Sequence, residues 1–176
     1  NLFERHRSGE AIDAEMLAAA TTVVAVHGNA DDYDTMLAGF THASTPQDQL
    51  RHLYALAEFN DPALITRTCE FAMSDAVRTQ NAPFLLRTAI ANRHQGRRAW
   101  EFVRDRWEEA VDRFPNNTHG RMIDSVKLLT APEVVADVQS FFAEHPIPQA
   151  AKTLDQVLER QRTNAALRAR EADRLG

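Results

Sequence analysis

Apolar residues recur every three or four positions along most of this 176-residue chain. The spacing is clearest in the segment 81–121, where the later apolar positions are Trp100, Val103, Trp107, Ala110, Val111 and Phe114. Residues spaced in this way lie on one side of an α-helix. The shorter stretch 84–90 has the same pattern, and Gln95-Gly96 separates the two. We therefore predict an antiparallel helical hairpin, whose second arm carries both tryptophans of the protein and belongs to the middle of a core.

Capping signals delimit the helices in the first half of the chain. Asp13 can cap a helix that continues to Gly28, where glycine is expected to adopt the left-handed conformation that ends helices. A second helix should cover roughly 31–42. Thr45-Pro46 and Asp61-Pro62 each join an N-cap residue to a proline, which suits the first helical position. These signals predict two further helices.

The second half continues in the same way. A short helix is expected after Arg121. Thr130, with Glu133 three positions later, resembles a capping box that opens the next helix. The two prolines of segment 145–148 form a rigid break, after which a final helix should run from about Gln149 toward Gly176.

Because no segment alternates polar and apolar residues with the period of a strand, the chain is predicted to be all-α. Helix pairs open near residues 14, 46, 81 and 120, at intervals of 32, 35 and 39 residues. Such periods are typical of helical repeats. We expect an irregular HEAT-like αα superhelix, or α-solenoid, of about nine to ten helices in antiparallel pairs; a compact bundle is the alternative. Residues 1–176 should form a single helical domain, the C-terminal part of a longer multidomain chain.

Composition excludes several classes of partner. The chain has 20 Lys and Arg against 25 Asp and Glu, for a net charge of −5 and a pI near 5.8. This balance does not indicate nucleic-acid binding, which requires a concentrated basic surface. No apolar run is long enough to span a membrane, so no membrane partner is expected. The single cysteine, Cys69, cannot form an internal disulfide and favours the reducing cytoplasm.

The sequence offers no catalytic or metal-binding constellation of its own. A zinc peptidase needs two histidines one helical turn apart in an H-E-x-x-H motif, and the seven histidines here are scattered. There is also no G-x-S-x-G motif and no glycine loop for phosphate binding. Cys69 lies on an apolar face and is expected to be inert. Arginines in the final helix alternate with acids, which is typical of a solvated face. We predict no catalytic residue and no metal ligand in this chain.

Several motifs occur together in a recognisable order. They are Val26-His-Gly-Asn29, Asp34-Thr-Met-Leu37, Phe71-Ala-Met-Ser-Asp-Ala-Val-Arg-Thr-Gln-Asn81, Trp100-Glu-Phe with Trp107-Glu-Glu, and Val138-Gln-Ser-Phe-Phe-Ala-Glu-His-Pro-Ile-Pro148 followed by Thr153 and Asn164-Ala-Ala166. This set, over about residues 1–170, resembles the C-terminal helical domain of zinc aminopeptidases related to aminopeptidase N and puromycin-sensitive aminopeptidase.

The resemblance implies a function as well as a fold. It implies a non-catalytic domain that closes over an upstream catalytic domain and lines a chamber for peptide substrates. Zinc would be held upstream, with no cofactor in this segment. Family members place an arginine at the helix that follows the double-tryptophan helix, facing the substrate side, and Arg121 matches it. Here Thr118 and His119 replace the apolar residues usual before that arginine.

Two alternatives remain from the residues alone. Arg121 could pair with a neighbouring acid or cap a helix end, because ion-paired arginines are common on helical surfaces. The whole chain could also be a free-standing HEAT-like module that binds protein partners.

Overall fold

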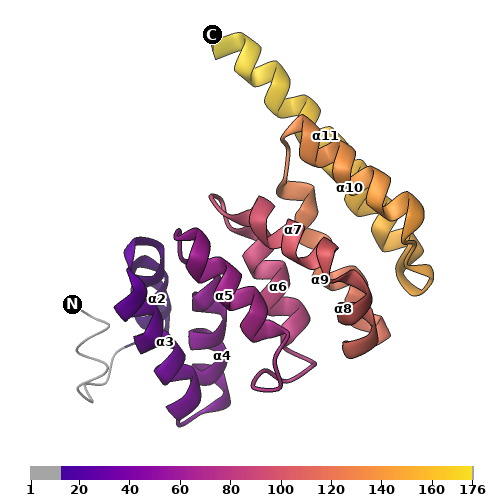
Figure 1. Cartoon of the computed structure of the whole chain (residues 1–176). Helices are drawn as coiled ribbons and strands as arrows, with labels where there is room; N and C mark the ends of the chain where they lie inside the picture. Colours follow the sequence, from indigo (N-terminus) through magenta and orange to yellow (C-terminus); the bar gives the residue numbers. More distant parts are fainter. Residues whose placement is uncertain (1–12, 176) are drawn as a thin grey trace. The chain divides into compact units, whose positions relative to one another are not determined.

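A computed structural model describes residues 13–175 of the chain (Figure 1). This range contains ten α-helices, four short 3-10 helices and no strand, which confirms the all-α prediction. The fold divides into two compact units, and the boundary between Thr68 and Cys69 falls inside helix α5 (Pro62–Ala72). We describe each unit separately.

The first unit contains α2 (Ala14–His27), α3 (Ala30–His42), α4 (Pro46–Ala55), the 3-10 helix η1 (Leu56–Glu58) and the start of α5. Three predicted N-caps are confirmed. Asp13 accepts hydrogen bonds from the backbone of the first turn of α2. The Thr45 hydroxyl accepts the Asp48 amide at 3.1 Å, and the Asp61 carboxylate accepts the amide of Ala63 at 2.7 Å.

The predicted left-handed conformation of Gly28 is wrong. Its φ of −78° and ψ of 165° are those of extended backbone. Glycine is required there for close approach, because a Cβ atom at this position would lie 2.5 Å from the carbonyl oxygen of Val24 and 2.9 Å from Cβ of Asp32. The following helix then begins with a capping box formed by Asn29 and Asp32.

Tyr33 is at the centre of the first unit's core. Its fully buried ring meets Phe59 edge to face, with the ring centroids 5.2 Å apart. The Tyr33 hydroxyl lies 3.0 Å from the Thr68 hydroxyl, which also donates toward the carbonyl oxygens of Leu56 and Leu64. These contacts connect α3, η1 and α5 and leave no buried hydroxyl unpaired in the cluster.

The second unit begins with the predicted hairpin, in which α6 (Ala82–Ala91) packs against α7 (Gly96–Asp105). The second arm is not one continuous helix. It stops at Arg106, whose φ of −117° and ψ of 25° are not helical, and resumes as α8 (Trp107–Arg113). The guanidinium of Arg106, an exposed residue, lies 4.1 Å from the ring centroid of Phe102.

The chain then continues through η2 (Asn116–Thr118), α9 (His119–Met122), η3 (Asp124–Leu128), α10 (Pro132–Glu144), η4 (Pro148–Ala150) and α11 (Ala151–Leu175). The short helix predicted after Arg121 is therefore two pieces, α9 and η3. The capping box is wrong, because α10 has Ala131 at its N-cap and no side-chain cap. The Thr130 hydroxyl instead accepts a hydrogen bond from Arg168 of α11 at 2.9 Å.

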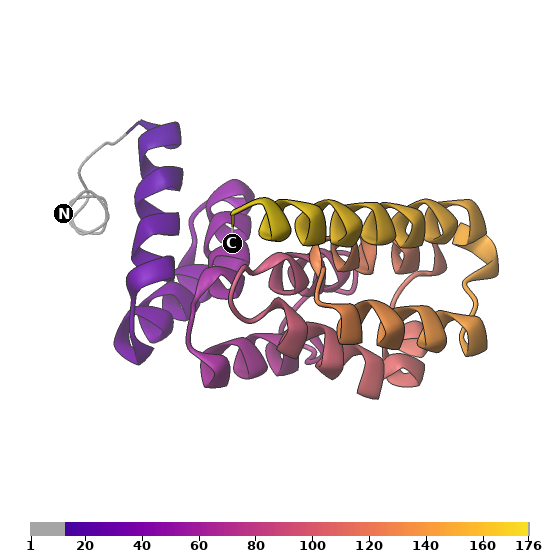
Figure 2. The same ribbon diagram turned by 90° about the horizontal axis from the view of Figure 1, so that it is seen from above.

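Figures 1 and 2 show α10 and α11 packed side by side and antiparallel after the predicted break. An aromatic cluster lies between α10 and the hairpin. Trp100 and Trp107 contact Phe141 and Phe142 with centroid distances of 5.5–5.6 Å. The Trp100 indole donates to the Asp137 carboxylate at 2.7 Å, which satisfies the one polar group of a fully buried ring. The double-tryptophan segment thus belongs to the core, as the sequence predicted.

Candidate functional site

Arg121 is an exposed residue inside a run of buried ones. Apart from Arg121 itself, all residues from 118 to 123 are buried, and Met122 and Ile123 are inaccessible to solvent. Because the backbone on both sides of Arg121 is held by packing, its side chain starts from a fixed position. The predicted candidate is therefore on the surface of the second unit.

Local hydrogen bonds hold the two polar residues that precede the glycine. The Thr118 hydroxyl donates to the Pro115 carbonyl oxygen at 2.7 Å, and Nε2 of His119 lies 3.0 Å from the Phe114 carbonyl oxygen. Both side chains are buried. Their replacement of apolar residues leaves these polar atoms paired, so it is compatible with a packed turn in front of Arg121.

Gly120 brings this turn against the beginning of the last helix. A Cβ atom at position 120 would lie 2.8 Å from Cβ of Ala150 and 3.5 Å from Cγ2 of Thr153. Real Cβ atoms do not approach so closely, so only glycine allows α9 to pack at this distance from η4 and α11. The glycine therefore sets where Arg121 sits relative to the last helix.

The Arg121 guanidinium forms no hydrogen bond and no ion pair with any residue in the range 13–175. The alternative in which it pairs with a neighbouring acid is not realised there. An unengaged guanidinium keeps its full set of N–H donors, which match a carboxylate or a peptide carbonyl group.

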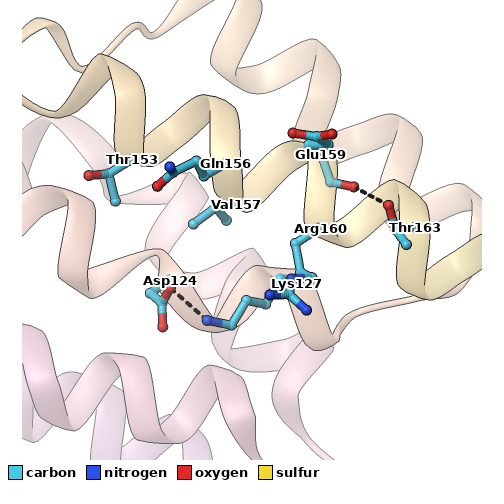
Figure 3. Close-up of a pocket in the computed structure, with 8 residues that line it drawn as sticks. All are labelled: Asp124, Lys127, Thr153, Gln156, Val157, Glu159, Arg160 and Thr163. Carbon is cyan, nitrogen blue, oxygen red and sulfur yellow. Dashed lines mark hydrogen bonds and ion pairs between the residues drawn. The ribbon is translucent and has the colours of Figure 1, made fainter.

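A groove adjoins this turn, between η3 and α11. It has a volume of about 570 Å³ and is lined by Asp124, Lys127, Thr153, Gln156, Val157, Glu159, Arg160 and Thr163 (Figure 3). The Asp124 carboxylate receives Lys127 Nζ at 2.7 Å and a guanidinium nitrogen of Arg87 at 3.1 Å. Two cationic side chains, Arg87 and Lys127, thus pair with one carboxylate beside the face of the last helix.

Sequence reasoning did not identify this groove. The arginines of the last helix were predicted to be a solvated face, and Arg160 is indeed exposed. Positions 153, 156, 157, 160 and 163 recur every three or four residues, which places them on one side of a helix. What the sequence could not show is that η3, a 3-10 turn, lies beneath that side.

Among residues 13–175, no group of three or more His, Cys, Asp or Glu side chains could hold a metal ion. The Cys69 thiol is buried, and burial, the largest cause, together with Glu70 raises its pKa from 9.0 to about 12, although Arg106 opposes the shift. A thiol with so high a pKa is a poor nucleophile at neutral pH. None of the helices in the described range is both long and apolar enough to cross a membrane.

Comparison with known proteins decides the family. The sequence model of the ERAP1-like C-terminal domain matches residues 1–163, which cover the first compact unit and most of the second. The chain belongs to this family. The resemblance to the C-terminal domain of aminopeptidase N-type enzymes is thereby confirmed.

Relatives of this ERAP1-like domain include several much longer proteins. Aminopeptidase M1-A of Oryza sativa subsp. japonica is 27% identical over 169 residues, or 94% of this chain and 19% of that protein. Aminopeptidase M1 of Arabidopsis thaliana is 29% identical over 174 residues, or 93% of this chain and 19% of that protein. Glutamyl aminopeptidase of Rattus norvegicus is 28% identical over 141 residues, or 78% of this chain and 15% of that protein. The chain thus spans less than a fifth of these relatives.

Proposed function

We propose that this ERAP1-like domain is the non-catalytic C-terminal part of a zinc-dependent aminopeptidase, and that it closes over the catalytic domain and lines the chamber that receives peptides. The family match and the names of the relatives support an aminopeptidase. Because the relatives are named aminopeptidases, we assign zinc to an upstream domain and no chemical step to this one. Its partners would be that domain and peptide substrates.

The observation that carries the substrate-facing role is the state of Arg121. Its guanidinium is exposed, has no partner within the described range, and extends from backbone fixed by buried neighbours. The fixed backbone sets the point from which the side chain extends, and the exposed guanidinium keeps its donors free for a peptide carboxylate or carbonyl group. In the proposed chamber, Arg121 binds and orients the peptide while the reaction takes place elsewhere.

Two further parts of the proposal concern organisation. We propose that the helix pairs of residues 1–176 continue as one HEAT-like superhelix within a single domain. The buried, solitary Cys69 supports a reducing, cytoplasmic setting, because it has no cysteine partner within the chain.

Kinetics of the complete aminopeptidase test the role of Arg121. Replacement Arg121→Ala should lower kcat/KM for peptides about 10- to 150-fold, as loss of a hydrogen bond to a charged group implies, while the melting temperature stays unchanged. Arg121→Lys should retain part of the activity, since the charge remains without the planar fork. The matched control is Arg98→Ala, which removes an exposed arginine from α7 and should leave kcat/KM unchanged.

Unchanged kcat/KM of the Arg121→Ala enzyme across several peptides would remove this residue from the substrate site. A separate observation tests the proposal that the longer chain is a zinc aminopeptidase. If the longer chain that carries this domain lacked an H-E-x-x-H motif, the zinc aminopeptidase proposal would fail, and the free-standing interaction module would replace it.

A further inference from the structure

A second hollow in the second unit, which we call the α8 cleft, has a volume of about 410 Å³. It is lined by α8, by the turn before Arg121 and by the segment that joins α10 to α11. Trp107, Val111 and Ile147 give it an apolar wall, and Trp107 and Ile147 are buried. The cleft therefore offers an apolar surface bordered by polar side chains.

The charge of the α8 cleft is negative. The described residues that line it include two carboxylates, Glu108 and Glu144, and neither lysine nor arginine. Two arginines line the adjoining pocket, but Arg104 pairs with two other carboxylates and Arg106 lies over an aromatic ring. The lining thus carries two negative charges when its histidines are neutral, and it favours a cation.

The buried residue His119 adds an acceptor that has no partner. This residue is only 5% exposed, and its Nε2 lies 3.0 Å from the Phe114 carbonyl oxygen. Because a carbonyl oxygen can only accept, Nε2 carries the hydrogen, and Nδ1 of the neutral ring has a lone pair. Nδ1 has no hydrogen-bond partner among residues 13–175, although His119 lines the cleft. Since buried acceptors are normally paired, this atom favours a ligand that donates hydrogen bonds.

His145 and Glu108 provide two further acceptors. Nδ1 of His145 lies 3.0 Å from the Phe141 carbonyl oxygen, which by the same reasoning leaves the lone pair of the neutral ring on Nε2. The His145 ring stacks on Phe141 with centroids 4.2 Å apart, which holds its orientation. Its Nε2 lies 4.0 Å from Oε1 of Glu108. Two acceptors at this distance cannot bond each other, but a nitrogen about 2.8 Å from each can donate to both.

We propose that the α8 cleft binds an organic cation with several N–H groups, an alkylammonium or an alkylguanidinium. Glu108 and Glu144 supply the opposite charge, and His119 and His145 accept hydrogen bonds. The apolar wall at Trp107 suits the alkyl stem of such a cation. A metal ion is a poor alternative, because residues 13–175 contain no group of three or more side chains that could hold one. The site goes beyond the chamber proposal and does not depend on it.

Binding to the 176-residue chain itself tests the cleft. We would follow backbone amide shifts by NMR at about pH 7.5, where an ordinary imidazole is mostly neutral. N-acetyl-arginine amide, N-acetyl-lysine amide and butylamine should each shift residues of α8 and of segment 144–149 saturably. N-acetyl-citrulline amide lacks the charge and tetramethylammonium lacks N–H groups, so both should bind at least about fivefold more weakly. Tighter binding of an amino-acid derivative than of butylamine would identify a peptide side chain as the source, and otherwise the source is a small free amine.

Matched variants complete the test. Glu108→Gln and Glu144→Gln should each weaken binding of N-acetyl-arginine amide about two- to fivefold, as loss of an exposed ion pair implies. Asp112→Asn removes an exposed carboxylate of α8 outside the cleft and should not change binding. Because all three side chains are exposed, thermal unfolding of the variants should match that of the parent. Saturation should also move the Nδ1 resonance of His119.

Three results would overturn the assignment to an organic cation. They are equal binding of the citrulline derivative or of tetramethylammonium, full affinity in either glutamine variant, and an unmoved Nδ1 resonance of His119. These titrations measure binding to the 176-residue chain without a catalytic domain, so their failure would leave the chamber proposal untouched.

Discussion

The contact between Gly120 and Ala150 can be tested quantitatively. In Gly120→Ala the new Cβ would lie 2.8 Å from Cβ of Ala150, whereas carbon atoms in contact prefer about 3.5–4.0 Å. Overpacking of this kind costs about 1–3 kcal/mol. Alanine also restricts the unfolded chain and so returns about 0.4–1 kcal/mol. Subtracting the middle of the second range, about 0.7 kcal/mol, from the middle of the first, about 2 kcal/mol, we expect the free energy of unfolding to fall by about 1.3 kcal/mol.

A second substitution separates the clash from other effects of alanine. Ala150→Gly alone removes a half-buried methyl group and should cost about 0.5–1 kcal/mol. In the double variant Gly120→Ala/Ala150→Gly, residue 120 has a Cβ atom and residue 150 has none. The clash between two Cβ atoms is therefore absent. The double variant should therefore be more stable than the sum of the single effects by at least about 1 kcal/mol, as expected for residues in direct contact.

Urea denaturation followed by tryptophan fluorescence measures these quantities. Both tryptophans, Trp100 and Trp107, belong to the second unit, so the signal reports the unit that contains the contact. The control is Arg121→Ala, which removes an exposed side chain and should change stability by less than about 0.5 kcal/mol. Additive single effects, or a Gly120→Ala chain as stable as the parent, would show that α9 does not pack on the last helix at this distance.

Two other features of the chain lead to measurable expectations. Because the pKa of the buried Cys69 is raised from 9.0 to about 12, the folded state favours the neutral thiol; stability is retained below pH 9 and lost as pH rises toward 12. Relative to Cys69→Ala, the parent should lose about 2 kcal/mol between pH 8 and 10.5 in urea denaturation, and parallel pH profiles would contradict the shift. Asp137→Ala should destabilise by about 1–3 kcal/mol and change the fluorescence of Trp100, since the buried indole N–H loses its acceptor. Asp105→Ala, which removes an exposed partner of Arg104, should cost less than about 1 kcal/mol, and equal losses in the two variants would refute the assigned role of Asp137.

Short-range sequence signals predicted the helices well where a side chain caps its own backbone. Asp13, Thr45 and Asp61 cap as expected because each bond joins residues two or three positions apart. Predictions failed where a distant element competed for the same atom or space. Thr130 has a nearby amide to cap, yet its hydroxyl accepts a bond from Arg168, which lies 38 residues further along the chain.

Gly28 and Arg106 show two different reasons for such failures. Gly28 was expected to provide a left-handed turn, but the need for glycine comes from Asp32 and the Val24 carbonyl oxygen, whose proximity appears only in three dimensions. At Arg106 the apolar spacing continues unbroken through a backbone break. Periodicity reports which side chains face the core and does not report whether the hydrogen-bond ladder between them is continuous.

The same distinction applies to function. Arg121 could be singled out by its place after the double-tryptophan helix, whereas the groove beside it depends on two segments about 30 residues apart in the chain. In both places a short, irregular segment holds a polar side chain next to buried residues: Met122 and Ile123 next to Arg121, and Val126 next to Lys127. A domain without catalytic residues can in this way still hold charges at defined positions. Segment 119–128 thus carries Arg121 and Lys127, whereas six of the eight residues that line the groove belong to α11, a long regular helix, so the irregular and the regular helices together define this surface.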